Sequence, residues 1–394
     1  MSTRLREDLL RLLGEADADV RRRESGSLEE AVGGLDRPFV LFGAGHLGKK
    51  VLNVLRRLGH RPLAFIDNNP ALAGTSIEGI DVYTPAAFVA QHDPAHVGVI
   101  TTIWSGEATD RMRDRIGPLK QLGFRNVALF GHMAWAFKEA FLPYYALDLP
   151  SRVLREKDRI LAAFDLMSDE ASRQIFVEHV RWRLWLDYDR LPEPCSEEIY
   201  FNTKYVNVVP DEVVYDIGAF DGDTAAAFVN GIRGRAFSHV YCFEPMTSNY
   251  EALVARLRGD GDRFAQVSAH RLALGDERRS ISVESSGGPA ARVGAGQDSV
   301  EMTTVDDFAS HHKAPSFLKL DIEGFEQRCL SGARATIERL QPVIAVCVYH
   351  LQAHLWDIPL QIQGVRGGYR FHLLPHVVDG WDLVLYAVPQ GRAV

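Results

Sequence analysis

Cysteine is scarce in this chain of 394 residues, and its four cysteines form no CxxC pair. Three of the four lie inside apolar runs, which indicates reduced, buried thiols and excludes a disulfide scaffold. Long apolar runs are also missing, because charges interrupt the N-terminal residues every few positions. Neither a signal peptide nor a membrane span is therefore expected, and we predict a cytoplasmic protein without a membrane anchor.

The chain also lacks an excess of positive charge. Its 44 Lys and Arg residues face 52 Asp and Glu residues, which gives a formal net charge of −8. The basic residues are scattered or paired with acids, so nucleic acid is not predicted as a partner. The hydrophobic fraction of 46% and the charged fraction of 24% are ordinary globular values. At this length we expect two domains.

Alternation of apolar runs and helical stretches divides the chain into four segments. Residues 1–34 combine an amphipathic helix with a charged link; the helix is interpreted as a packing or dimerisation helix, so a homo-oligomer stays open. Residues 35–134 alternate strand and helix, which predicts a Rossmann-like parallel sheet. Residues 135–199 show apolar residues at helical spacing, which predicts a helical connector. Residues 200–394 alternate again and predict a second α/β domain.

The segment from residue 200 onward contains seven candidate strands. Helical patterns separate the early ones. The last two, YRFHLL and LVLYAV, are joined by a short loop, which demands an antiparallel pair. We therefore predict a mainly parallel seven-stranded sheet with one antiparallel strand.

A strand, a glycine turn and a helix follow one another in VVYDIGAFDGDTAAAF. Gly218 and Gly222 can adopt turn geometry and leave room for a ligand close to the backbone. No GK[ST] follows, so the loop is not a P-loop. Three acids crowd the turn: Asp216, Asp221 and Asp223. Acids would repel a pyrophosphate, but they suit the ammonium and sulfonium groups of S-adenosylmethionine.

Two further strand ends support the same ligand. The strand HVYCFE ends in Glu244, whose carboxylate could accept hydrogen bonds from both ribose hydroxyls. Small and apolar side chains in LALGD, residues 272–276, could form one wall of an adenine slot. The residues predicted to bind the donor are Asp216, Gly218, Ala219, Phe220, Asp221, Gly222, Asp223, Thr224, Glu244, Pro245, Ala273 and Asp321.

A pair of carboxylates follows the strand FLKL. Asp321 and Glu323 stand at its carboxyl end, where open α/β sheets bind ligands, and His350 follows the strand VCVY. An unperturbed histidine has a pKa that suits a general base. We predict Asp321, Glu323 and His350 as catalytic residues. Asp321, Glu323 and a histidine could also hold a divalent cation, but no clear metal spacing is present, so metal dependence stays open.

Together these motifs carry a family resemblance. YDIGAFDGDT, CFEP, LALGD, LKLDIEGFE and VCVYH followed by LWDIPL resemble the FkbM-type methyltransferases over about residues 200–394. The resemblance implies a class I methyltransferase fold and S-adenosylmethionine as methyl donor. It also implies methylation of an oxygen on a sugar, polyketide or related small molecule, so a small-molecule acceptor is the expected partner.

The N-terminal segment carries a fingerprint of its own. FVLF is followed by Gly43, Gly45 and Gly48 in a GxGxxG pattern, and Asp67 ends the next strand, as in dinucleotide-binding domains. The continuation FIDNNP resembles nucleotide-binding domains found ahead of sugar-modifying transferases. Three uses stay open: binding the nucleotide of a nucleotide-sugar acceptor, binding a regulatory nucleotide, or serving as a scaffold.

Two other classes of protein compete with the methyltransferase interpretation. An NAD-dependent oxidoreductase would use the N-terminal GxGxxG but would leave the C-terminal motifs unused. A non-catalytic nucleotide-sugar binding protein could retain every motif.

Overall fold

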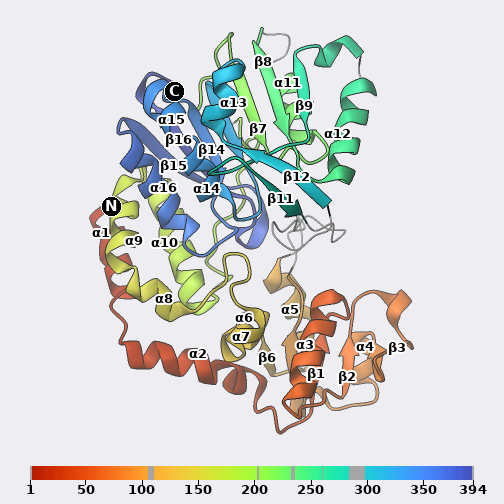
Figure 1. Ribbon diagram of the computed structural model, residues 1–394. Coiled ribbons are helices and arrows are strands. Elements are labelled where there is room, and N and C mark those ends of the chain that lie inside the picture. The colour runs from red at the N-terminus through yellow and green to blue at the C-terminus, as the bar shows by residue number, and fades with distance from the viewer. Residues whose placement is uncertain are drawn as a thin grey trace.

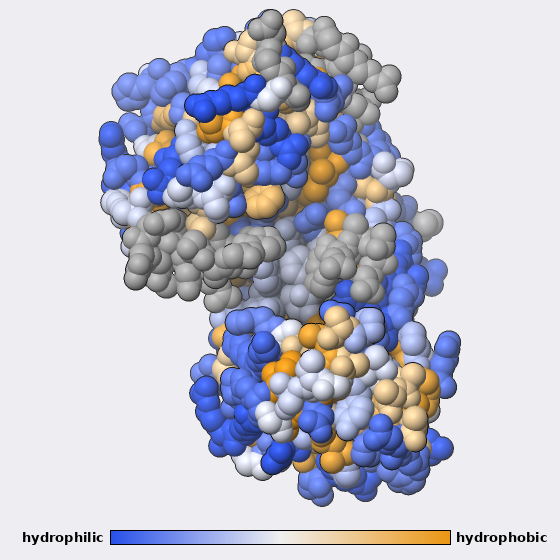
Figure 2. Space-filling model, turned by 90° about the vertical axis from the view of Figure 1, so that its right-hand side faces the viewer, coloured by the Kyte–Doolittle hydropathy of each residue, from blue (hydrophilic) through white to orange (hydrophobic). Residues whose placement is uncertain are grey.

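The computed structural model describes residues 2–104, 111–201, 204–231, 236–259, 261–283 and 298–392. It consists of two α/β domains, which lie one above the other in Figure 1, with helices joining them along one side. The space-filling view shows the same two lobes, and hydrophilic residues cover much of the visible face of both (Figure 2). Among the described helices, none has the length and apolar character that crossing a membrane requires.

The N-terminal domain is built on a six-stranded sheet in the order β3-β4-β2-β1-β5-β6. Only β3 runs antiparallel to its neighbour, so the predicted parallel sheet is confirmed. The strands are β1 (Phe39–Phe42), β2 (Ala64–Ile66), β3 (Ser76–Ile77), β4 (Ile80–Tyr83), β5 (Gly98–Thr101) and β6 (Asn126–Ala128). Its helices are α3 (His46–Arg57), α4 (Pro85–Val89) and α5 (Met112–Gln121).

The N-terminal segment differs from the expected helix and link. It forms two helices, α1 (Ser2–Leu12) and α2 (Asp17–Val32), so the charged stretch is helical rather than extended. Its charges form ion pairs one turn apart, such as Arg21 with Asp17 at 2.6 Å. Its buried face, which includes Val32, packs in the core of the N-terminal domain. Charge alone therefore does not indicate a link when the apolar residues recur at helical spacing.

The predicted connector is helical. It follows α6 (Phe130–Ala136), which packs in the core of the N-terminal domain, and its helices are α7 (Lys138–Phe141), α8 (Pro150–Arg155), α9 (Lys157–Leu166) and α10 (Glu170–Trp185). Asp169 caps α10 by accepting a hydrogen bond from the Ser172 backbone N–H at 2.8 Å. The second oxygen of Asp169 lies 2.5 Å from Nδ1 of His372 in the C-terminal sheet, which ties the connector to that domain.

The C-terminal domain contains the predicted seven-stranded sheet, in the order β15-β16-β14-β13-β7-β8-β9. Only β16 runs antiparallel to its neighbours, as expected from the short loop before it. The strands are β7 (Val213–Ile217), β8 (His239–Phe243), β9 (Val267–His270), β13 (Phe317–Leu320), β14 (Val343–Cys347), β15 (Tyr369–Pro375) and β16 (Leu383–Pro389). The central strands β7, β13 and β14 are buried along their whole length, as apolar strands covered on both faces must be.

Helices cover both faces of this sheet (Figure 1). They are α11 (Asp223–Gly231), α12 (Thr247–Gly259), α13 (Val305–His311), α14 (Glu326–Gly332), α15 (Arg334–Leu340) and α16 (His354–Val365). A small sheet that was not expected stands beside it, made of β10 (Ala273–Leu274), β11 (Arg279–Val283) and β12 (Asp298–Thr303). The candidate strand SAHRLAL is therefore split, because β9 pairs with β8 whereas β10 pairs with β12.

Candidate active site

The glycine loop after β7 forms one wall of the site. Gly218 has φ +84°, and a Cβ there would lie 1.9 Å from the backbone oxygen of Asp321, so only glycine fits this close approach to the end of β13. Phe220, at the tip of the loop, also has a positive φ, of 46°, and is 49% exposed. A non-glycine residue in this conformation is strained, and such strain is often found at ligand sites.

Glu244 anchors this loop from the end of β8. Its Oε2 accepts a hydrogen bond from the Phe220 backbone N–H at 3.0 Å, and its Oε1 accepts one from the Met246 N–H at 2.8 Å. Burial raises the pKa of Glu244, although both N–H groups favour its ionised form. The Asn249 side chain also hydrogen-bonds to this carboxylate, and the acceptor capacity that remains on it suits a ribose hydroxyl.

Asp216 and Lys319 form a buried ion pair below the loop. They stand side by side on β7 and β13, with Lys319 Nζ 3.0 Å from the Asp216 carboxylate. The same ammonium donates a hydrogen bond to the Gly218 carbonyl at 2.6 Å. Burial lowers the pKa of Lys319, but the carboxylates of Asp216 and Asp321 outweigh this and raise it. The pair therefore fixes the start of the glycine loop.

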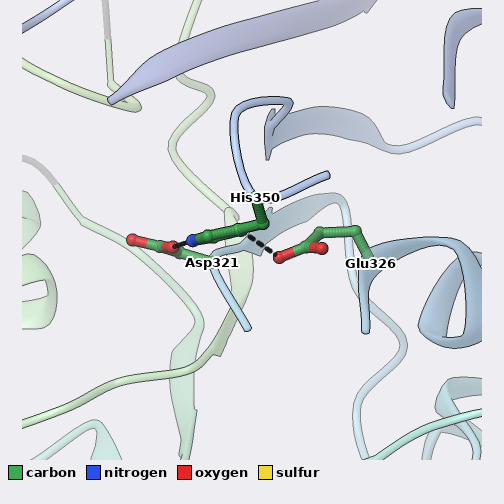
Figure 3. Close-up of side chains that lie close together, drawn as sticks. All are labelled: Asp321, Glu326 and His350. Carbon is green, nitrogen blue, oxygen red and sulfur yellow. Dashed lines mark hydrogen bonds and ion pairs between the residues drawn. The ribbon is translucent and has the colours of Figure 1, made fainter. Parts of the chain in front are cut away.

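Carboxylates and a histidine gather at the ends of β13 and β14 (Figure 3). His350 lies between two acids: its Nδ1 donates to Glu326 at 2.7 Å, and its Nε2 is 3.3 Å from Asp321. Nε2 is also 3.8 Å from the carboxylate of Glu323. The Tyr200 hydroxyl donates to the other oxygen of Asp321 at 2.8 Å. Glu326, which the sequence did not single out, thus belongs to this cluster.

Burial and mutual charge set the pKa values in the cluster. Burial lowers the pKa of His350, but the nearby carboxylates, Glu326 first, raise it to about 9. Burial raises the pKa of Glu326, but the imidazole outweighs this and lowers it to about 2. Burial raises the pKa of Glu323 to about 7 and that of Asp382 to about 6. The His350–Glu326 pair is therefore ionised, which holds the imidazole in place.

A cavity of about 530 Å³ lies at the carboxyl ends of these strands. This volume is in the range of small-molecule and cofactor pockets. Many of its lining residues were predicted from the sequence: Gly218, Phe220, Asp223, Thr224, Glu244, Pro245, Ala273, Asp321 and Glu323. The cavity thus joins the ends of four motifs that are far apart along the chain.

Several predicted residues support the cavity from behind. Asp216 does not line the cavity, but its partner Lys319 does. Asp221 is also outside the lining and forms an ion pair with Arg256 at the surface. His350 stands behind Asp321 and Glu323, with a side chain that is 1% exposed. Ala219 and Gly222 are also outside the lining; the first donates its N–H to the Phe243 carbonyl and the second packs against Leu253.

Sequence reasoning missed five polar residues of the lining: Tyr200, Asn249, Lys319, Tyr349 and Asp382. The sequence could have indicated Lys319, because a charged residue inside an apolar, buried strand needs a partner of opposite charge. Asp382, in the loop before β16, accepts a hydrogen bond from Tyr349. The lining thus contains five carboxylates and one ammonium: Asp223, Glu244, Asp321, Glu323 and Asp382 against Lys319.

The N-terminal fingerprint forms the expected strand, turn and helix. Gly43 has φ +113°, and a Cβ on Gly48 would lie 2.1 Å from the Gly43 carbonyl oxygen, so helix and strand meet closely there. Gly45 precedes α3 and has open space around its Cβ position. Asp67 accepts hydrogen bonds from the Ala44 N–H at 2.7 Å and from the Asn69 N–H at 2.8 Å. This repeats the arrangement of Glu244.

Comparison with known proteins places the C-terminal motifs in a family. The model of the methyltransferase FkbM domain matches residues 216–371. None of the curated proteins matches the chain. The crystal structure of a methyltransferase FkbM from Methylobacillus flagellatus superposes with a TM-score of 0.75 at 20% identity, over 98% of this chain and 100% of that one. The two proteins thus share a fold over nearly their whole length.

More distant structures match only part of the chain. One, a putative rRNA methylase from Clostridium thermocellum, has a TM-score of 0.30 at 11% identity and covers 48% of this chain and 89% of its own. The matched family segment starts at Asp216 and contains the glycine loop, Glu244 and the cluster at the end of β13. The chain is therefore an S-adenosylmethionine-dependent methyltransferase, and its residues 216–371 match the methyltransferase FkbM domain.

Proposed function

We propose that this enzyme methylates a hydroxyl group of a sugar, a nucleotide-linked sugar or a similar hydroxylated metabolite. The observation that carries the proposal is the uneven distribution of acceptor groups across the cavity. The Glu244 carboxylate stands at the end of β8, whereas Asp321, Tyr349 and Asp382 stand beyond β7 at β13, β14 and the start of β16. Neighbouring strands are about 4.8 Å apart, so the two ends are separated by several strand spacings.

The β8 and β7 end suits the donor. The Glu244 carboxylate can accept a hydrogen bond from a ribose hydroxyl, and Ala273 with Leu272 and Leu274 offers an apolar wall for the adenine. S-adenosylmethionine supplies a methyl group on a positively charged sulfur, which an oxygen nucleophile can displace. The excess of carboxylates over ammonium groups in the lining favours that charge.

The β13 and β14 end suits a hydroxylated acceptor. Carboxylates and phenols line it, and these groups bind hydroxyls through hydrogen bonds. Asp321 and Glu323 hold the acceptor hydroxyl, and Asp321 takes its proton while the oxygen–carbon bond forms and the carbon–sulfur bond breaks. His350 is not one of the described residues that line the cavity. It therefore acts from behind, by holding Asp321 in place.

The N-terminal domain fits this proposal as a holder of the acceptor's nucleotide. Asp67 offers the same carboxylate arrangement at its strand end as Glu244 does. A nucleotide-linked sugar would then be preferred over the free sugar.

Transfer of a labelled methyl group tests the proposal. The full chain is incubated with labelled donor and a panel of free and nucleotide-linked sugars, and the product bond is identified by mass spectrometry. The expected label is in a methyl ether, with higher kcat/KM for nucleotide-linked acceptors. Label on nitrogen or carbon of the acceptor would contradict the proposed hydroxyl chemistry.

Donor binding is tested by the variant Glu244→Gln. The substitution removes the negative charge and one acceptor position, and hydrogen bonds to charged groups contribute about 1.5–3 kcal/mol. We expect the affinity for S-adenosylhomocysteine, measured by calorimetry, to fall about tenfold or more. The exposed acid Glu251, on α12, provides the control: Glu251→Gln should leave the affinity unchanged. Equal affinities in both variants would remove Glu244 from the donor site.

A further inference from the structure

His350 presents a buried nitrogen that lacks a hydrogen bond. Its side chain is 1% exposed, and Nε2 has no hydrogen-bond partner among the described residues. This nitrogen is aimed at the carboxylate of Asp321, as Figure 3 shows, and Glu323 lies beside it. We propose that Nε2 of His350 and the carboxylates of Asp321 and Glu323 form a binding site for one divalent metal ion of the Mn²⁺ or Mg²⁺ type. The inference rests on the proposed function and adds the group that activates the acceptor.

Two distances from Nε2 bear on coordination. Metal–ligand bonds of about 2.1 Å place adjacent ligands roughly 3.0–3.4 Å apart. Nε2 of His350 is 3.3 Å from Asp321 Oδ1 and 3.8 Å from Glu323 Oε2. The distance to Asp321 already equals the spacing of two ligands of one ion. A small rotation of the Glu323 side chain would bring the distance to Glu323 to the same value. One imidazole with two carboxylates is a donor set for hard or borderline divalent cations.

The groups behind the ligands are arranged as in metal sites. Glu326 accepts the Nδ1–H of His350, and the proposed ion displaces the proton that Nε2 carries in the metal-free chain. Ligating histidines commonly donate their other N–H to a carboxylate in this way. Oε1 of Glu326 also accepts the backbone N–H of Ile322 at 2.9 Å, and its Oε2 lies 3.3 Å from Nδ1 of His354, so we assign Glu326 a supporting role. The Tyr200 hydroxyl holds the second oxygen of Asp321.

The charge of the cluster also favours a cation. Asp321, Glu323 and Glu326 place three carboxylates around one imidazole, and Lys319 is occupied by Asp216. The imidazole balances Glu326, and the two remaining carboxylates, which are closely spaced and partly buried, are costly unless a further cation neutralises them.

The position of the ligands shows how the ion can enter the site and how it can act on the acceptor. The side chains of Asp321 and Glu323 are 25% and 24% exposed and line the cavity, so an ion can enter from the acceptor side. With three protein ligands, coordination positions remain for an acceptor oxygen, and Oδ2 of Asp321, which does not bind the ion, remains to take the proton. An ion there orients the hydroxyl and makes its proton more acidic.

Titration of Mn²⁺ into the metal-free full chain tests the site, followed by electron paramagnetic resonance and calorimetry. We expect one ion per chain, and about tenfold or greater loss of affinity in Glu323→Gln and in His350→Gln. Asp382→Asn is the matched control, because it removes a neighbouring carboxylate of the same cavity that is not a proposed ligand. It should keep the affinity within about threefold, because a lost ligand weakens metal binding more than a lost neighbouring charge.

Two results would overturn the inference: no Mn²⁺ binding by the wild type, or an equal loss of affinity in Asp382→Asn and Glu323→Gln. Thermal unfolding of each variant checks its fold. If His350→Gln proves unstable, the metal affinity of Glu323→Gln decides the test. S-adenosylhomocysteine binding is measured on the same metal-free samples. Binding of this compound without any Mn²⁺ binding would refute the metal site alone, whereas loss of both would refute the proposed function as well.

Discussion

Asp321→Asn is expected to lower kcat by about 10²–10⁴, the usual contribution of a group that takes a proton in the reaction. The variant keeps the shape of the side chain but removes the charge that faces the acceptor end of the cavity. Affinity for S-adenosylhomocysteine should stay within about threefold, since the donor's nucleoside is proposed to lie on Glu244. Steady-state kinetics with the acceptor found above, together with calorimetry, measure the two effects separately.

Tyr200→Phe provides a graded comparison. It removes the hydroxyl that holds Oδ2 of Asp321 and leaves the carboxylate in place. Its loss of kcat should be smaller, about tenfold, because a supporting group contributes less than the group it holds. A kcat within threefold of the wild type for Asp321→Asn would exclude Asp321 from the chemistry.

Asp216→Ala is expected to destabilise the protein by about 3–5 kcal/mol. The substitution leaves the Lys319 ammonium buried, and the acceptor that remains to it among the described residues is the Gly218 carbonyl, at 2.6 Å. Urea denaturation, followed by a probe in the C-terminal domain, measures the change. Reduced donor affinity in this variant would therefore reflect a disturbed glycine loop as well as a lost contact.

The double variant Asp216→Ala with Lys319→Met separates charge from packing. Removing both partners of a buried ion pair costs less than removing one. We expect the double variant to recover much of the lost stability. A single variant that loses less than 1 kcal/mol, or a double variant that is less stable than the single one, would show that the pair does not support the loop.

The sequence predicts much of the fold, for physical reasons that can be named. Apolar runs and glycine turns alternate, so strands, helices and their order follow from periodicity. The carboxyl ends of parallel strands meet at one edge, so residues as distant as Gly218, Glu244 and Asp321 could be expected to share a site. All three line the cavity.

Other parts of the site could not be predicted. Tyr200 lies before β7 in a segment without regular structure, and only the tertiary fold brings its hydroxyl to Asp321. Asp382 enters from the loop between β15 and β16. The pairing of Asp216 with Lys319 depends on the register of β7 and β13, which periodicity does not specify. The position of His350 behind the carboxylates depends in turn on Glu326.

The two glycine loops offer the most direct test of this account. A crystal structure of the full chain with S-adenosylhomocysteine should place the ribose against Glu244 and the sulfur on the side of the cavity that faces Asp321. Density for the compound at the Gly43 loop and Asp67, with the cavity between Glu244 and Asp321 empty, would contradict the assignment of the donor site and of the chemistry built on it.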